Sequence, residues 1–245
     1  KENPSDENLI KYSNYLKSSR PTAVNLSWAI DRIYKKVCRV EEYERFDIAF
    51  KEANLIRKED IQMCSNIGDN GLQIIKKILK KKYSQNNNAI RKINILTHCN
   101  AGWLATVDWG TALAPIYKAV RENIKLHVWV DETRPRNQGA SLTAYELKSE
   151  GISHSVIVDN AGGFLMQNDM VDVVIVGSDR TTSTGDVCNK IGTYLKALAA
   201  KENNIPFYVA LPISTIDWTL EDGVKTIPIE ERSSDEVQYM TGIDM

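Results

Sequence analysis

A cysteine and an aspartate each follow an apolar run that has the character of a β-strand. Cys99 follows residues 93–97 and leads into Asn100-Ala101-Gly102, and Asp179 follows residues 171–176. A thiol can act as a nucleophile or an acid/base, and a carboxyl group can move protons. Because the carboxyl ends of parallel strands form the ligand crevice of open α/β sheets, we expect both side chains to face one substrate. This is the layout of an enzyme.

Each of these residues also has an ordinary structural explanation. A single cysteine is more often a small buried hydrophobic residue, and Asp179 could cap a helix or pair with Arg180. His98 precedes Cys99, but neighbours in an extended chain point to opposite sides. We therefore interpret His98 as structural rather than as the base of a Cys-His pair.

Polar and cationic residues that could hold an anion lie in three further segments. Arg134, Arg136 and Gln138 follow an apolar run that ends at Asp131, where arginines could bind a phosphate and Gln138 a sugar hydroxyl. Arg20 precedes the first long helical pattern. The structural alternative for residues 134–138 is a turn held by Pro135 and Gly139. Pro21, beside Arg20, fits the first turn of a helix, but this does not explain Arg20.

The third segment is residues 181–186, which resembles a hydroxyl-rich loop before a helix and could hold a phosphate through its amides and hydroxyls. Lys190 would lie one turn into the helix expected over residues 186–202. An exposed helical lysine is usually only solvated, so Lys190 carries no conclusion alone.

Bulk composition excludes several classes of protein. The 245 residues carry 31 basic and 32 acidic side chains, a net charge of −1, so no global field attracts nucleic acid or an anionic membrane. Four widely separated cysteines argue against a zinc site or a disulfide scaffold and fit a reducing, cytoplasmic environment. The apolar runs are too short for a membrane span of roughly 20 residues. No metal-ligand cluster is evident, and we expect no metal.

The hydrophobic pattern changes near residue 90. Before it, apolar residues recur at helical spacing in residues 24–37, 46–56 and 72–79, and the lysine run at 76–82 continues the last helix. The polar residues 84–88 form the expected boundary. We therefore predict a helical N-terminal region over residues 1–88 and a Rossmann-like catalytic domain over residues 89–245.

After residue 90, short β-branched runs alternate with amphipathic segments. Strands are expected at 93–97, 126–130, 155–158, 171–176 and 207–210, and helices at 111–122, 138–150, 162–170 and 186–202. Near-continuous apolar strands are usually buried on both faces of a parallel sheet. The predicted fold class is α/β, with a Rossmann-like, doubly wound, mainly parallel sheet.

Several longer motifs resemble one enzyme family, the methylthioribose-1-phosphate isomerases, which are similar in fold to the α, β and δ subunits of translation initiation factor 2B. The motifs cover nearly the whole chain and are residues 20–26 (RPTAVNL), 97–102 (THCNAG), 131–135 (DETRP), 138–140 (QGA), 185–187 (GDV), 189–194 (NKIGTY), 206–210, 214–217 and 227–232.

The resemblance implies an aldose–ketose isomerase of methionine salvage, which converts 5-methylthioribose 1-phosphate into 5-methylthioribulose 1-phosphate. It implies a homodimer that needs no cofactor. The catalytic pair of the family carries over to Cys99 and Asp179, and its substrate-binding residues carry over to Arg20, Gln138 and Lys190, with Asn189 as a neighbour.

The substrate's C1 phosphate blocks spontaneous ring opening, so the enzyme must assist it. We hypothesise that Asp179, in an apolar pocket that raises its pKa, protonates the ring oxygen and later moves the hydroxyl proton. Cys99 would act as acid/base at C2 in a phosphoenolate route, or polarise the site during a hydride shift. The sequence leaves both routes open.

Two alternatives and two departures from the family remain. Ribose 1,5-bisphosphate isomerase shares the cysteine and aspartate, whereas an initiation-factor-like regulatory subunit would not need them. Trp103 and Trp109 suit a methylthio group through sulfur–aromatic contact, although ordinary packing explains them equally well.

The family's N-terminal Arg-Gly-Ala loop and C-terminal tail are not found in this sequence, and the first residue is Lys, so we expect missing terminal segments.

Overall fold

The computed structural model describes residues 3–84 and 92–239. The chain forms two compact units. The helical unit comprises Lys1–Met63, Ser178–Cys188 and Pro212–Glu230, and the sheet unit comprises Cys64–Gly177, Asn189–Leu211 and Glu231–Met245. These units differ from the division at residue 88 into a helical region and a Rossmann-like domain, which stays a prediction.

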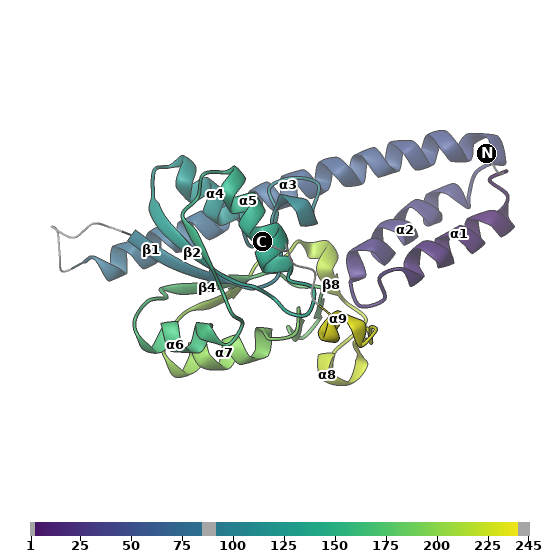
Figure 1. The fold of residues 1–245 in the computed structure, drawn as a ribbon. Coiled ribbons are helices and arrows are strands. Elements are labelled where there is room, and N and C mark those ends of the chain that lie inside the picture. The colour runs from purple at the N-terminus through teal and green to yellow at the C-terminus, as the bar shows by residue number, and fades with distance from the viewer. Residues whose placement is uncertain (1–2, 85–91, 240–245) are drawn as a thin grey trace, which may run out of the picture. The chain divides into compact units, whose positions relative to one another are not determined.

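The helical unit contains α1 (Asp6–Ser18), α2 (Val24–Val37), the short η1 (Glu42–Glu44) and the first part of the long α3 (Arg45–Lys82) (Figure 1). Ser5 caps α1, because its side chain accepts a hydrogen bond from the Asn8 amide. Lys17 pairs with Asp31 between α1 and α2. The helices predicted at 24–37, 46–56 and 72–79 are confirmed.

A small three-stranded sheet completes the helical unit, and the sequence did not predict it. The order is β6-β5-β8, formed by β5 (Arg180–Thr182), β6 (Val187–Cys188) and β8 (Ile216–Asp217). The short η4 (Ile213–Thr215) and α8 (Gly223–Thr226) flank β8.

The sheet unit holds five parallel strands in the order β3-β2-β1-β4-β7. The strands are β1 (Lys92–Thr97), β2 (Lys125–Asp131), β3 (His154–Ile157), β4 (Val173–Val176) and β7 (Phe207–Val209). All five strands predicted from the apolar runs are confirmed, and β1 lies at the centre between β2 and β4.

Helices cover both faces of this sheet, so the doubly wound fold is confirmed (Figure 1). They are α4 (Ala114–Arg121), α5 (Ala144–Ser149) with the π-helical turn η3 (Gly139–Thr143), α6 (Ala161–Gln167) and α7 (Thr193–Glu202), and a short α9 (Asp235–Gln238) follows near the C-terminus.

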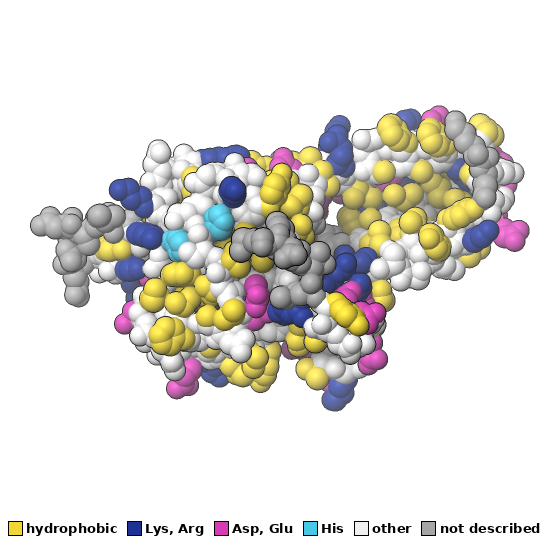
Figure 2. Space-filling view, in the orientation of Figure 1, with side chains coloured by type: hydrophobic (Ala, Val, Ile, Leu, Met, Phe, Trp, Pro, Cys, Tyr) yellow, Lys and Arg dark blue, Asp and Glu magenta, His cyan; other side chains and the backbone are white. Residues whose placement is uncertain are grey.

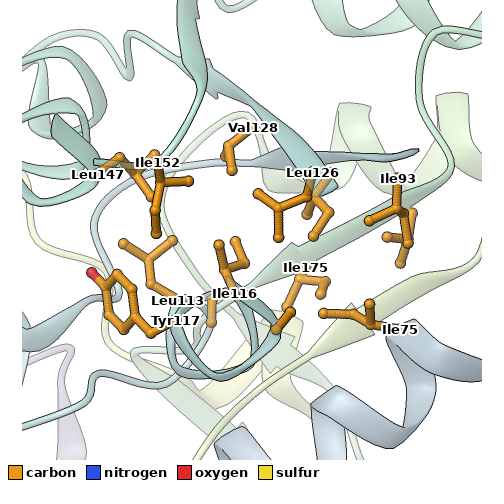
Figure 3. Packing of buried hydrophobic residues seen from close by; sticks show 14 of the residues in the cluster. Ile75, Ile93, Leu113, Ile116, Tyr117, Leu126, Val128, Leu147, Ile152 and Ile175 are labelled. Carbon is orange, nitrogen blue, oxygen red and sulfur yellow. The ribbon is translucent and has the colours of Figure 1, made fainter. Parts of the chain in front are cut away.

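Alternate residues of β1 enter two different hydrophobic cores. Ile93 packs in one cluster with Ile116 of α4 and Ile75 of α3 (Figure 3). Ile95 belongs to the same cluster, whereas Leu96 packs in a second cluster with residues of α6. Side chains alternate across a strand, so a strand buried on both faces must be apolar at nearly every position. This explains why the apolar runs predicted the strands well.

The helix predicted over residues 186–202 is wrong in its first part. Val187 and Cys188 pair with Thr181 and Arg180 as an antiparallel strand, and α7 begins only at Thr193. Gly192 precedes α7 with a φ of 103°, a conformation that helix-forming L-residues avoid. The predicted boundary loop at 84–88 lies outside the described residues from position 85 onward. Across the described residues, the helices are too short or too polar to cross a membrane.

Candidate active site

Cys99 lies directly beyond β1 in a backbone conformation that non-glycine residues rarely adopt. Its φ is 68°. Two threonines hold this conformation: the Cys99 amide donates to Thr133 Oγ1 at 2.9 Å, and the Cys99 carbonyl accepts from Thr143 Oγ1 at 2.7 Å. Such strain persists where the surrounding structure imposes it, and it is concentrated at functional sites. The loop therefore presents a half-buried thiol in a fixed position.

The buried carboxylate of Glu146 anchors the rest of the Cys99 loop. It accepts hydrogen bonds from Asn100 Nδ2 at 2.8 Å, from the Trp103 amide at 2.6 Å and from Tyr117 Oη at 2.6 Å. Burial, followed by the hydrogen bond to Glu146, raises the pKa of Tyr117 far above its usual range. Multiple donors from separate segments make Glu146 the centre of a cross-linked loop.

Gln138 lies after β2 and leads into the π-helical turn η3. Among the buried side-chain atoms of the described residues, Gln138 Oε1 and the neighbouring Asn137 Oδ1 lack a hydrogen-bond partner. Buried polar atoms are normally satisfied, and single π-helical turns often occur at functional sites. Gly139 closes the turn against β2, because a Cβ there would overlap the Asp131 carbonyl oxygen. The two amide oxygens are thus suited to accept hydrogen bonds from a ligand.

Asn189 and Lys190 belong to an irregular segment before α7, so the expectation that Lys190 lies one turn into a helix is wrong. Asn189 Nδ2 donates to Thr193 Oγ1 at 3.0 Å, and that hydroxyl donates to the Lys190 carbonyl at 2.7 Å. Within the part of the chain that the structure describes, the Lys190 ammonium group has no hydrogen bond or ion pair. It is half-buried and is suited to an anion.

Hydrogen bonds connect the segments that carry four of the predicted site residues. The Cys99 loop contacts the residues on either side of Gln138 through Thr133 and Thr143, and His98 contacts the segment of Asn189 and Lys190 through the Ile191 carbonyl. All four belong to the sheet unit. They lie at the carboxyl ends of β1 and β2 and before α7.

The other two predicted site residues, Arg20 and Asp179, lie together in the helical unit. Arg20 Nη2 is 3.9 Å from Asp179 Oδ1, and Arg20 Nε is 3.8 Å from Glu230 Oε1. Backbone hydrogen bonds fix Asp179 further, since its amide donates to the Cys188 carbonyl and its carbonyl accepts from the Val24 amide. The structure thus brings a guanidinium group to the predicted catalytic carboxyl.

Two expectations for this region are wrong. The pocket around Asp179 is not apolar, because a guanidinium group lies nearby and the Asp179 side chain is 32% exposed. Residues 181–186 are not a free loop, because β5 includes Thr181 and Thr182, and Asp186 Oδ2 accepts from the Gly223 amide at 2.9 Å. The hydroxyls are largely used in this local sheet and turn: Thr182 pairs with Thr184, and Ser183 donates to the Leu220 carbonyl.

The two tryptophans near Cys99 have different surroundings. Trp109 lies against two cations of α4, with Lys118 Nζ 4.7 Å and Arg121 Cζ 4.4 Å from its ring centre. Trp103 makes an edge contact with Tyr145, and its buried Nε1 is another unpartnered atom within the described residues. Trp109 is therefore engaged in cation–π contacts, whereas Trp103 packs against an aromatic ring.

The matching family model is that of the initiation factor 2 subunit family, and it spans residues 3–245. The chain belongs to this family.

Similar proteins of known sequence are named methylthioribose-1-phosphate isomerases. Methylthioribose-1-phosphate isomerase of Gluconobacter oxydans is 60% identical over 240 residues, which is 98% of this chain and 64% of that protein. The enzyme of Rhizobium meliloti is 59% identical over 98% of this chain and 64% of its own length. The chain thus spans somewhat less than two thirds of the length of these relatives.

Similar solved structures are named either as the isomerase or as a subunit of a translation initiation factor. 5-Methylthioribose 1-phosphate isomerase from Pyrococcus horikoshii has a TM-score of 0.77 and 41% identity, covering 94% of this chain and 61% of that one. Translation initiation factor eIF-2B subunit delta from A. fulgidus has a TM-score of 0.73 and 40% identity, covering 96% of this chain and 64% of that one. The fold therefore accompanies both names, and function must be argued from the site.

The sequence did not indicate Glu146, Thr133 or Thr143 as parts of the site. Glu146 lies in a segment predicted as an amphipathic helix, where a glutamate is normally solvent-exposed. The one available signal was the place of Glu146 on the buried side of the helix, beside the apolar Leu147. The neighbouring threonine and tyrosine make that buried side hard to recognise from the sequence.

Proposed function

We propose that this protein is an aldose–ketose isomerase that converts 5-methylthioribose 1-phosphate into 5-methylthioribulose 1-phosphate in methionine salvage. The observation that carries the proposal is 60% identity over 98% of the chain to a curated isomerase with this activity in its name. The strained Cys99 and the orphaned amide oxygen of Gln138 support it, because both are features of a site rather than of a simple scaffold.

Cys99 and Asp179 are the proposed catalytic pair. Cys99 follows β1, Asp179 comes shortly after β4, and these two strands are parallel neighbours. Gly177, at the end of β4, allows close approach of the Cys99 loop, since a Cβ there would lie 2.9 Å from Ala101 Cβ. Adjacent carboxyl ends supporting one reaction centre are typical of this class of sheet.

The proton route needs two groups that each act twice. The Cys99 thiolate removes the proton from C2 while Asp179 protonates the ring oxygen. The bond between C1 and the ring oxygen then breaks, and a C1–C2 double bond forms. Asp179, now a carboxylate, takes the proton of the C2 hydroxyl, and the Cys99 thiol returns a proton to C1. Both groups end in their starting states, and the phosphoester is untouched.

In the hydride route the hydrogen moves from C2 to C1 with its electrons, and Cys99 only polarises the site. Turnover in deuterated water separates the two routes. Deuterium at C1 of the product supports proton transfer through Cys99, and product entirely free of deuterium supports the hydride shift.

Arg20, Gln138, Asn189 and Lys190 are the proposed substrate-binding residues. Lys190 and Arg20 supply cations for the phosphate, and Gln138 and Asn189 supply amides for sugar hydroxyls. Partial exposure of the Arg20 side chain, at 58%, leaves its guanidinium group accessible to an anion. The proposal needs no cofactor and no metal, and it includes a homodimer in the cytoplasm.

A regulatory subunit of the initiation-factor type is the second candidate, favoured by 40% identity to the A. fulgidus eIF-2B delta subunit structure. Ribose 1,5-bisphosphate isomerase is the enzymatic alternative. The complete protein should be assayed with both sugars, and its mass in solution measured by light scattering. Turnover of the methylthio sugar alone supports the proposal. Turnover of the bisphosphate supports the alternative enzyme, and a folded protein inactive on both supports the regulatory subunit.

A further inference from the structure

His98 lies in the sheet unit with both ring nitrogens next to acceptor atoms. Nδ1 is 2.8 Å from Asp131 Oδ2, and Nε2 is 2.7 Å from the Ile191 carbonyl oxygen. The side chains of His98 and Asp131 are both 0% exposed. Water therefore does not complete either hydrogen bond, and the two acceptors fix where the hydrogens are.

The acceptors require hydrogen on both nitrogens. A carbonyl oxygen can only accept, so Nε2 must carry a hydrogen. Asp131 Oδ2 also lies 3.1 Å from the Lys196 ammonium group, which is a donor, and a carboxylate at this position accepts from both neighbours. With a hydrogen on Nδ1 as well, both ring nitrogens donate to their acceptors, and the ring is an imidazolium ion.

The surrounding charges balance in this state. The charged groups facing His98 are Asp131 at the end of β2, Asp159 after β3 and Lys196 on α7, and Asp159 Oδ1 is 3.9 Å from His98 Nδ1. Two carboxylates thus face two cations. A neutral His98 with a protonated Asp131 would instead place the Lys196 ammonium against an uncharged carboxyl, and buried charges need partners.

The ammonium of Lys196 also fills the role that a metal ion could have in this cluster. His98, Asp131 and Asp159 offer ligand atoms within 4.8 Å of one another. The ammonium group already contacts Asp131 and donates to the Asp159 carbonyl, so the cation of this cluster belongs to the chain itself.

The chain around Ile191 is shaped to pass over the imidazole ring. A Cβ on Gly192 would lie 3.0 Å from His98 Nε2, and the φ of Gly192 is 103°. A side chain at this position would be strained and crowded against the ring. His98 therefore holds the centre of the segment that carries Asn189 and Lys190, and Thr193 holds its end.

We propose that His98 is a positioning residue, a buried imidazolium that bridges Asp131 and the Ile191 carbonyl and so fixes the substrate-binding segment of Asn189 and Lys190. This inference rests on the proposed function for the role of that segment, but the charge and hydrogen bonds of His98 do not depend on it. His98 acts through Lys190 rather than on substrate. Its place next to Cys99 couples the thiol loop to the anion-binding lysine.

The first test is spectroscopic and uses the complete, unmodified protein. The chain has three histidines, so labelling with 15N-histidine gives few imidazole signals from it, and His98→Gln assigns its own. We expect both His98 nitrogens to carry a hydrogen. In protein that also carries 13C at the isoleucine carbonyls, we expect Nε2 to show coupling across the hydrogen bond to the Ile191 carbonyl carbon. His127 is the internal contrast, because burial lowers its pKa and so favours the neutral ring. One unprotonated His98 nitrogen, or no coupling to Ile191, would overturn the proposal.

The second test is kinetic. In His98→Gln the segment of Lys190 loses its fixed position, so we expect KM for the sugar phosphate to rise roughly tenfold with a smaller change in kcat. His154→Gln is the matched control on the edge strand β3 and should leave both constants unchanged. A folded His98→Gln enzyme with wild-type KM contradicts the positioning role. If the wild-type protein isomerises nothing, the proposed function fails, and the spectroscopic result still decides the state of His98. If His98→Gln does not fold, His127→Gln and His154→Gln assign the other two histidine signals of the chain, and the wild-type spectrum then decides the state of His98 by elimination.

Discussion

The backbone of Gly102 lies directly against the carboxylate of Glu146, so closely that a Cβ on Gly102 would overlap Glu146 Oε2. This contact joins the loop that begins at Cys99 to a buried acceptor on α5. Only glycine permits it. The position of the thiol thus depends on a residue three places along the chain that has no functional group of its own.

Gly102→Ala should disturb this contact. We expect a loss of about 1–3 kcal/mol in the free energy of unfolding, because the added methyl group has no room. We also expect kcat to fall roughly tenfold or more, because the loop after Cys99 must move. Urea denaturation and steady-state kinetics measure the two effects.

Gly163→Ala provides the control. Gly163 lies in α6, where a new Cβ would meet Ala199 Cβ at an ordinary 3.8 Å. We expect this variant to be more stable by about 0.5 kcal/mol, because alanine favours helix, with unchanged activity. If both variants behave alike, the crowding at Gly102 is not what fixes the loop.

Tyr117 should make stability fall at high pH. Its pKa is raised above the ordinary 10.0, first by burial and then by its hydrogen bond to Glu146. Above pH 10 the unfolded chain loses this proton and the folded chain keeps it, so the stabilisation present below pH 10 declines as pH rises. Urea midpoints measured at about pH 9 and about pH 11 should differ more for wild type than for Tyr117→Phe. Equal differences would show that Tyr117 is not held protonated.

Glu52 should make the helical unit sensitive to acid. The Glu52 side chain is 4% exposed, and its pKa is lowered from 4.5 by hydrogen bonds from Lys36 and then Arg32, against the effect of burial. A lowered pKa gives stability that is present above pH 4.5 and is lost as pH falls below it. Circular dichroism should show acid unfolding of wild type at this pH, with a shallower dependence in Glu52→Gln. Glu44→Gln, at an exposed glutamate, is the control. If the stability of Glu52→Gln depends on acid pH as strongly as that of wild type, Glu52 is not the source of the acid sensitivity.

Gln138→Ala and Lys190→Met should separate substrate binding from catalysis. Gln138 Oε1 lacks a partner within the described residues, so its removal costs the fold little and costs substrate affinity more. We expect KM to rise for both variants with little change in melting temperature. The test is a thermal melt beside steady-state kinetics; a lower melting temperature with unchanged KM would assign these side chains to the fold.

The sequence predicted the parallel sheet well because burial on both faces leaves a simple apolar signal. The alternating apolar residues of these strands enter two cores, as Ile95 and Leu96 of β1 do. The same argument located Cys99 beyond β1.

Other features depend on contacts between distant segments, which leave no periodic signal. The strand of Val187 and Cys188 exists because Arg180 and Thr181 pair with it, and from sequence alone it reads as the start of a helix. The surroundings of Asp179 likewise depend on Arg20, which is far away in the chain.

Exposed apolar side chains were also unexpected. Figure 2 shows hydrophobic side chains along the helices of the helical unit, where Phe46 and Phe50 stack with ring centres 6.3 Å apart while remaining 73% and 63% exposed. Helical periodicity predicts an apolar face correctly but does not say what covers it.

The most direct test of the central claim is the conversion of 5-methylthioribose 1-phosphate by the complete protein, followed by phosphorus NMR, with Cys99→Ala and Asp179→Asn measured in parallel. We expect the wild type to form the ketose phosphate, and both folded variants to lose activity by roughly a thousandfold or more, since each removes one of two groups that transfer protons. Wild-type turnover retained in either folded variant would contradict the proposed catalytic pair, and no turnover by the folded wild type would contradict the proposed function.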